Sequence, residues 1–183
     1  RAKTIIALGA CAHVGNIPSI RHVADERHLE TLKYYKNQQN DDVPEGPVPL
    51  HKVIPVDFTL PGCPPDREEI KSFIKQTLLG KTFRSYKDPV CVECRLRDNG
   101  CLLDEGEICL GPITAGGCQA VCPTKGFRCF GCRGLTDDAN FIEYFELMKE
   151  KGFAISDVKK AMNTFTALDV KERLKGTPYE ENT

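Results

Sequence analysis

The sequence contains no tryptophan, only two methionines and no long run of apolar residues. A membrane-spanning helix needs about 20 predominantly apolar residues, so the sequence predicts no transmembrane segment. It also lacks an excess of charge of either sign, because 25 lysines and arginines stand against 26 aspartates and glutamates. The resulting net charge of -1 argues against nucleic acid as a partner, since such binding depends on a basic surface.

The start of the sequence, at Arg1, lacks a secretory signal pattern. A strand-like apolar run follows almost at once, at residues 4–8, which is typical of the middle of a fold. We therefore expect a preceding segment, outside this sequence, to complete the first domain, and the alternative is a processed N-terminus. The 183 residues present are 40% hydrophobic, which predicts a folded chain of one ordinary domain or two small ones.

Two strand–loop–helix units are predicted in the first half of the chain. Residues 4–8 are typical of a strand buried on both faces, and residues 53–60 form a second candidate strand that contains Pro55. Helices are expected at about 19–35 and 66–79. The inward stripe of the second helix comprises Ile70, Phe73, Ile74, Thr77 and Leu78. This alternation of strands and helices predicts a parallel sheet with crossover helices.

A cysteine follows each predicted strand, Cys11 after the first and Cys63 after the second. Parallel strands point their carboxyl ends to one edge of the sheet, where open α/β folds bind ligands, so the two thiols should converge. One interpretation of such convergence is that Cys11 and Cys63 are two ligands of one metal site. The expected preceding segment then supplies the other two ligands. The alternative is a pair of unrelated buried thiols.

Eight of the ten cysteines fall between Cys91 and Cys132, in a segment without histidine. Their spacing is C-x2-C-x6-C-x7-C-x8-C-x3-C-x6-C-x2-C. The candidates are a disulfide framework, a pair of all-cysteine zinc sites and a pair of iron–sulfur clusters. Cys-Pro pairs at Cys63 and Cys122, abundant glycines and interleaved apolar residues favour the clusters. The cations that could balance cluster charge, or be ordinary surface residues, are Arg95, Arg97, Lys125, Arg128 and Arg133.

Helical periodicity returns in the last quarter of the chain. One predicted helix, closed by Gly152, has an apolar stripe of Phe141, Ile142, Phe145 and Met148. A further helix is expected to begin at a Ser156 cap. Its inward side chains are Val158, Met162 and Phe165. The polar end, residues 176–183, is expected to fray.

Four motifs resemble those of [NiFe]-hydrogenase small subunits. Gly9-Ala10-Cys11-Ala12 and Pro61-Gly62-Cys63-Pro64-Pro65 are similar to the third and fourth ligand motifs of that family's proximal cluster. Cys109-Leu110-Gly111-Pro112 resembles its junction between distal and medial clusters, and Cys129-Phe130-Gly131-Cys132 resembles its closing C-x-G-C. Residues 89–96 resemble most the cytoplasmic group, namely archaeal sulfhydrogenase delta subunits and small subunits of F420-non-reducing hydrogenase.

The resemblance implies three [4Fe–4S] clusters. Cys11 and Cys63 belong to the proximal cluster, whose other two ligands are missing. The implied distal ligands are Cys91, Cys94, Cys101 and Cys109. The implied medial ligands are Cys118, Cys122, Cys129 and Cys132. Periplasmic uptake members have histidine in place of Cys91 and proline in place of Cys122, and the latter change makes a four-iron medial cluster possible here.

The predicted fold class is α/β plus irregular structure, in three parts. Residues 1–87 are interpreted as the C-terminal part of a flavodoxin-like parallel-sheet domain that carries two proximal ligands. Residues 88–134 are interpreted as a two-cluster iron–sulfur domain, and residues 135–183 as a helical C-terminal segment.

The resemblance implies an electron-relay subunit of a cytoplasmic [NiFe]-hydrogenase, an oxidoreductase that acts on H2 at a separate large subunit. The implied partners are that large subunit and a flavin- or iron–sulfur-containing acceptor subunit, with NADP, F420, a heterodisulfide reductase or polysulfide as candidate terminal acceptors. The chain itself carries no implied catalytic residue. A zinc-binding interaction module and a stand-alone ferredoxin-type carrier are the alternatives. His13 could donate to a cluster sulfur or be purely structural.

Overall fold

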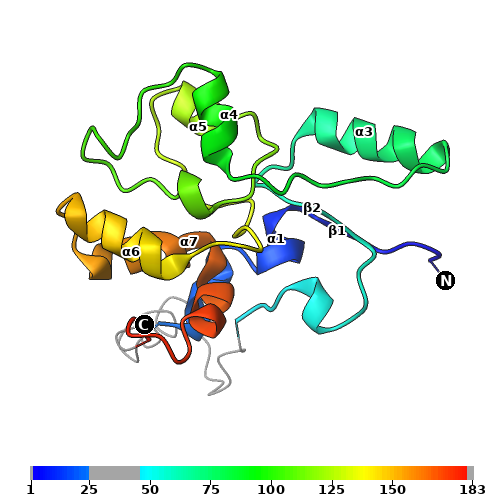
Figure 1. Cartoon of the computed structure of the whole chain (residues 1–183). Helices are drawn as coiled ribbons and strands as arrows, with labels where there is room; N and C mark the ends of the chain where they lie inside the picture. The colour runs from blue at the N-terminus through cyan, green and yellow to red at the C-terminus, as the bar shows by residue number, and fades with distance from the viewer. Residues whose placement is uncertain (1, 25–45, 181–183) are drawn as a thin grey trace, which may run out of the picture.

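The computed structural model describes residues 2–24 and 46–180, and it combines a small parallel sheet with helices (Figure 1). Strand β1 (Ile6–Leu8) pairs with strand β2 (Phe58–Leu60) in parallel, with Ile6 opposite Phe58 and Leu8 opposite Leu60. The predicted α/β class and the parallel pairing are therefore confirmed. The flavodoxin-like assignment of residues 1–87 and the other two part boundaries remain predictions.

Both strands are shorter and more exposed than the sequence predicts. Only Ala7 of β1 is buried, whereas Ile6 and Leu8 are exposed, so the prediction of a strand buried on both faces is wrong. The physical reason is that the described residues cover the face bearing Ile6 and Leu8 only in part. The second strand begins only at Phe58, because residues 50–52 form the 3-10 helix η2 (Leu50–Lys52) and Pro55 lies between.

The first helices after the strands differ from the predicted pattern. Helix α1 (Gly9–Val14) follows β1 directly and carries Cys11. The helix predicted at 19–35 is a 3-10 helix, η1 (Ile17–His22), where it is described, and residues 25–35 of the prediction lie outside the described residues. Pro18 at the start of η1 fits its first turn because proline lacks the N–H that would go unpaired there.

Helix α3 (Arg67–Leu78) matches the second predicted helix. The Asp66 carboxylate caps it by accepting the N–H groups of Glu68 and Glu69. Of its predicted inward stripe, Phe73 is buried and Ile70 is half-buried, as expected. The prediction is wrong for three exposed members, because α3 packs along the line of Glu69 and Phe73 instead. These exposed members are Ile74, Thr77 and Leu78.

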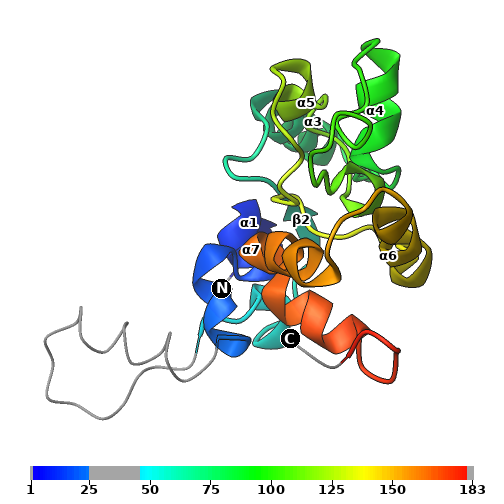
Figure 2. The same cartoon turned by 90° about the vertical axis from the view of Figure 1, so that its left-hand side faces the viewer.

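The cysteine-rich segment contains three short helices between loops. Helix α4 (Val90–Leu96) carries Cys91 and Cys94, and helix α5 (Val121–Thr124) carries Cys122. The 3-10 helix η3 (Gly111–Ile113) lies between them in the sequence. In both views α4 and α5 lie side by side at one end of the molecule (Figure 1, Figure 2).

Two longer helices, α6 (Phe141–Glu150) and α7 (Ile155–Arg173), complete the chain. Ile142 is exposed and Tyr144 is buried in its place, donating its hydroxyl to the Cys109 carbonyl at 2.9 Å. The Ser156 cap is wrong, because α7 already begins after Ala154, which offers no side-chain cap. Of the predicted inward side chains of α7, Val158 and Met162 are fully buried, and Phe165 is half-buried and lines the cavity described below.

The core joins the cysteine-rich segment to the C-terminal helices. Phe145, Met148 and Met162 are fully buried in one cluster with Leu110 and other residues of the cysteine-rich segment. The chain end expected to fray contributes Tyr179, whose ring packs 4.4 Å from that of Phe145. The predicted fraying is therefore wrong for residues 176–180. Residues 181–183 lie outside the described range. None of the described helices is long and apolar enough to span a membrane.

Candidate metal centre

Cys11 and Cys63 lie at one edge of the sheet, as the parallel arrangement predicts. The side-chain amide of Asn16 donates to Cys11 Sγ at 3.1 Å and reaches Cys63 Sγ at 3.8 Å. The Ala10 N–H donates to the Gly62 carbonyl at 2.8 Å, which ties the two loops together. Both thiols are exposed, so they are available to a ligand or a partner at this edge.

Asn16 is a site residue that sequence reasoning missed. It is 7% exposed and has a backbone φ of 57°, in the left-handed region that few residues other than glycine adopt. Its Oδ1 accepts the Ile17 N–H and its carbonyl accepts the Ser19 hydroxyl, so the side chain is fixed with its amide toward the thiols. The signal in the sequence is an Asn after Gly15, since asparagine tolerates a left-handed backbone.

His13 is not aimed at a thiol by any described contact. It packs instead against Gly134 and lies near His51 and Arg133. Burial is the main cause that lowers the pKa of His13 to about 4, and the charges of His51 and Arg133 act in the same direction. These surroundings support a structural role for His13.

Cys91 lies among the other three cysteines of the proposed distal group. Burial is the main cause that raises the pKa of Cys91 to about 12, and the neighbouring thiols of Cys109, Cys94 and Cys101 act in the same direction. Gly111 leaves room beside them, because a Cβ at this position would come within 3.0 Å of Cys91 Sγ. The distal cysteines thus face one another across a space that a glycine keeps open.

A cavity of about 790 Å³ is lined by all four cysteines of the proposed medial group. These are Cys118, Cys122, Cys129 and Cys132. Cys63 and the half-buried Phe165 also line it. Burial raises the pKa of Cys132, and the Cys118 and Cys122 thiols add to the effect. The cavity therefore joins the medial group to the edge at Cys63.

Backbone N–H groups point at several of these sulfurs. Cys129 N–H donates to Cys109 Sγ at 3.3 Å. Burial raises the pKa of Cys118, but the backbone N–H groups of Ala120 and Val121 act in the opposite direction. Gln119 and Ala120 both have positive φ, so the backbone turns sharply directly after Cys118. Thiolates that bind a metal need such donors because burial alone opposes their charge.

All ten cysteines are free, so the disulfide alternative has no support. Within residues 2–24 and 46–180, no three His, Cys, Asp or Glu side chains are close enough together to hold a single metal ion. Four thiolates around one zinc lie about 3.8 Å apart, given bonds of about 2.3 Å and tetrahedral geometry.

Arg133 connects the loops that carry these cysteines. The sequence places it among candidate surface cations, but it is 2% exposed and forms a bidentate ion pair with Glu69, with both N–O distances 2.9 Å. It also donates to the carbonyls of Gly116 at 2.6 Å and Pro61 at 3.1 Å. Because Arg133 follows Cys132 directly, one side chain fixes three cysteine-bearing loops relative to α3.

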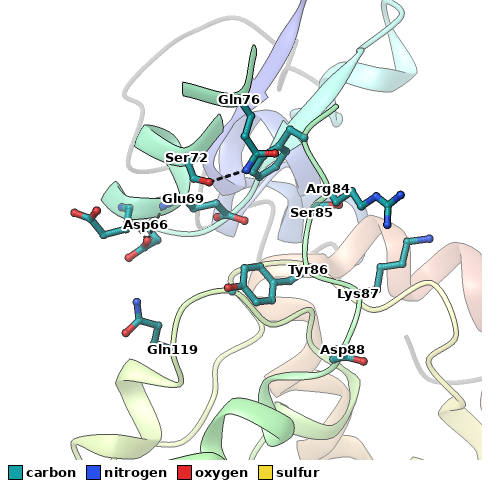
Figure 3. A pocket seen from close by; sticks show the side chains of 13 residues that line it. Asp66, Glu69, Ser72, Gln76, Arg84, Ser85, Tyr86, Lys87, Asp88 and Gln119 are labelled. Atoms are coloured by element: carbon teal, nitrogen blue, oxygen red, sulfur yellow. Dashed lines mark hydrogen bonds between the residues drawn. The ribbon is translucent and has the colours of Figure 1, made fainter. Parts of the chain in front are cut away.

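A larger groove, about 1010 Å³, lies between α3 and residues 83–88 (Figure 3). On its helical wall Gln76 donates to the Ser72 hydroxyl at 2.9 Å, and Tyr86 stands on the opposite side. Charged side chains of both signs line it, but no cysteine does. The cysteine-lined cavity, and not this groove, is therefore the candidate metal centre.

Comparison with known proteins finds relatives among the subunits of redox enzymes. The model of a family described as NADH ubiquinone oxidoreductase, 20 Kd subunit, matches residues 1–77. The first 77 residues are therefore similar to a subunit of a redox enzyme. The delta subunit of sulfhydrogenase 2 from Pyrococcus furiosus is 38% identical, over 82% of this chain and 62% of its own length.

Two further relatives belong to F420-non-reducing hydrogenases. The vhu G subunit of Methanocaldococcus jannaschii is 30% identical over 92% of this chain and 70% of its own length. The iron-sulfur G subunit of Archaeoglobus profundus is 26% identical over 73% of this chain and 57% of its own length. The chain therefore belongs to the hydrogenase small-subunit family that contains the sulfhydrogenase delta and F420-non-reducing hydrogenase G subunits. It spans 57% to 70% of the length of these three relatives.

Proposed function

We propose that this chain is the electron-relay subunit of a [NiFe]-hydrogenase, an enzyme that acts on H2 at a separate catalytic subunit. The contiguity of the three cysteine groups carries the proposal. Besides burial, the Cys63 backbone and thiol both influence the pKa of Cys132, so these two residues are neighbours. The Cys129 N–H in turn donates to Cys109 Sγ at 3.3 Å. Ligand groups that adjoin one another in series suit electron transfer better than separate structural sites.

The groups that we propose to be bound are [4Fe–4S] clusters, which supply one-electron redox chemistry when present. The donor set fits them, because thiolate ligands, N–H donors to sulfur and a glycine-lined space are all provided. The proximal group is Cys11 and Cys63, completed by ligands from outside this chain. The distal group is Cys91, Cys94, Cys101 and Cys109. The medial group is Cys118, Cys122, Cys129 and Cys132.

The chain's own residues bind the sulfur-linked groups and exclude water around them. Leu110, Ile113 and Val90 are buried in the core beside the cysteines. Low local polarity and N–H···S contacts are the protein's means of setting a cluster's potential. No acid, base or nucleophile is needed for this function.

The proposed partner at the proximal edge is the catalytic large subunit. Exposed Leu8 and Ile17 accompany the exposed Cys11 and Cys63 there, which is typical of a surface that a partner covers. A flavin- or iron–sulfur-containing subunit is the proposed acceptor. Ten unpaired cysteines suit a reducing compartment, so we propose the cytoplasm as the location.

Anaerobic purification of the intact subunit with its natural partners tests this function. We expect a brown complex that contains iron and sulfide, retains a large subunit and reduces methyl viologen with H2. Colourless protein with zinc would support the zinc-binding module, since zinc has no visible absorption. Brown protein without a large subunit would support a stand-alone carrier.

A further inference from the structure

Apolar side chains are exposed where α4 and α5 lie side by side. Leu96 on α4 is 81% exposed, and Phe127, just after α5, is 60% exposed. Val92, Val121 and Phe130 add smaller exposed areas. Large apolar groups that are this exposed and close together mark an interaction site. We call the surface formed by α4, α5 and residues 125–130 the α4–α5 face.

Hydrogen bonds connect the two helices into one surface. The Asn99 amide donates to the Thr124 hydroxyl at 3.1 Å, and the Arg97 guanidinium donates to Gln119 Oε1 at 2.6 Å. The Phe127 N–H donates to the Cys122 carbonyl at 2.9 Å. The exposed apolar groups therefore belong to a continuous, fixed surface rather than to separate loops.

Cations outnumber acidic residues around these apolar groups. The cations are Arg95, Arg97, Lys125 and Arg128. The acidic residues beside them are Glu93 and the exposed Asp98, and none occurs between positions 108 and 136. The pKa of Asp104 is lowered mainly by its hydrogen bond from Lys151, and nearby Arg95 adds to the effect. Among the described residues, no carboxylate forms an ion pair with Arg97, Lys125 or Arg128. Cations that are unpaired within the described chain complement acidic groups on a partner.

The α4–α5 face covers cysteines of two groups. Cys94 lies two residues before Leu96 on α4, and Cys122 follows Val121 on α5. Both thiols are only half-buried, so a protein seated on this face comes close to them. The face adjoins the cysteine-lined cavity, because Arg97, Val121 and Lys125 line it together with Cys63. Cys11 itself lies on α1 beside the sheet (Figure 1).

We propose that the α4–α5 face docks an acidic, ferredoxin-class iron–sulfur protein that accepts electrons from this subunit. The inference rests on the proposed function and adds the site and the charge of the acceptor. Oxidation of one H2 at the catalytic subunit releases two protons to solvent and two electrons. One electron reduces each [4Fe–4S] cluster of the carrier, so two carrier clusters are reduced for each H2.

The test uses the purified holo-complex, H2 and an acidic bacterial 2[4Fe–4S] ferredoxin as the probe. The variant Arg95→Gln/Arg128→Gln removes two cations of the face that do not line the cysteine cavity. The control, Lys71→Gln/Lys75→Gln, removes two exposed cations from α3. We expect KM for ferredoxin to rise tenfold or more in the first variant only. Reduction of methyl viologen, which needs no docking, should stay within twofold in both.

The salt dependence of KM and the replacement of apolar residues give two independent tests of the docking surface. For the wild-type complex, KM for ferredoxin should rise steeply with NaCl, and the first variant should lose most of this dependence. Leu96→Ser/Phe127→Ser should raise KM for ferredoxin without changing its salt dependence.

An unchanged KM for ferredoxin in both face variants overturns the proposal. A wild-type complex that reduces viologen but never ferredoxin also overturns it. Loss of the large subunit from the face variants also overturns it, because the face would then bind that subunit. Absence of all H2-dependent reduction overturns the proposed function itself.

Discussion

Arg133 and Glu69 form a bidentate ion pair in which Nη1 and Nη2 of Arg133 each lie 2.9 Å from a Glu69 carboxylate oxygen. Both side chains are almost completely buried. Glu69 belongs to α3, whereas Arg133 directly follows a cysteine of the proposed medial group. Because Arg133 also donates to two loop carbonyls, all its donor groups contribute to one junction. This pair connects the α/β part of the chain to the cysteine-rich part.

Replacement of Glu69 by Gln should strongly destabilise the subunit. It leaves the Arg133 charge buried without a counter-charge, which costs about 3–5 kcal/mol. The expected result is a lower thermal unfolding temperature of the purified complex, measured by differential scanning calorimetry. Glu68→Gln is the matched control on the same helix, because Glu68 pairs only with exposed Lys71. Equal unfolding temperatures for the two variants would contradict the structural role given to the pair.

Asn16→Ala should lower the reduction potential of the cluster that Cys11 and Cys63 bind. The Asn16 amide donates to sulfur and so stabilises the additional negative charge of the reduced state. Loss of one such bond, about 1 kcal/mol, corresponds to a shift of about 40 mV for a one-electron couple. An EPR-monitored redox titration of the complex measures the shift.

Asn99→Ala is the control for that experiment. The Asn99 amide lies 3.6 Å from Cys94 Sγ, so its removal should affect the distal signal and leave the proximal one unchanged. If the reduction potential of the proximal cluster is the same in Asn16→Ala and in the wild type, Asn16 does not influence that potential.

Iron analysis should give about twelve iron atoms for each intact subunit, if three cubes bind four irons each. Ten cysteines occur in this chain, and two further ligands are expected from the preceding segment. Inductively coupled plasma mass spectrometry of the anaerobically purified complex measures iron and zinc together. Zinc in place of iron would exclude the cluster assignment.

Cys122→Ala should convert the proposed medial four-iron cluster to a three-iron cluster. The other three cysteines of that cavity remain to hold the rest. Fewer thiolates and irons change the cluster type and raise its potential, which should slow electron transfer to a low-potential acceptor. Hydrogen activation at the large subunit should persist, as H2-dependent viologen reduction would show.

The diagnostic measurement for that variant is EPR of the oxidised protein, in which a three-iron cluster has a characteristic signal. An unchanged spectrum with an unchanged iron content would mean that Cys122 is not a ligand. The grouping of the eight cysteines would then have to be revised.

The convergence of Cys11 and Cys63 could be predicted from sequence, because it follows from a local rule. A cysteine placed after a parallel strand appears at the same sheet edge as one placed after its neighbour. The cysteine spacing likewise indicated the chemistry of the site, since thiol type and separation along the chain are properties of the sequence alone. The packed faces were less predictable: Ile74 and Ile142 fit apolar stripes but are exposed. Periodicity identifies a helix more reliably than it identifies which turns another element covers.

The sequence by itself therefore determined which residues can bind a metal and in what order they occur along the chain. The tertiary structure decided how they are held. Arg133 is one cation among several in its segment, and only its position opposite Glu69, 64 residues earlier, makes it a buried junction. In the sequence Asn16 is not distinguished from other loop residues. Only the folded sheet edge brings Cys11 and Cys63 to its side-chain amide. The physical reason is that burial and counter-charge depend on contacts between distant segments, which no local pattern encodes.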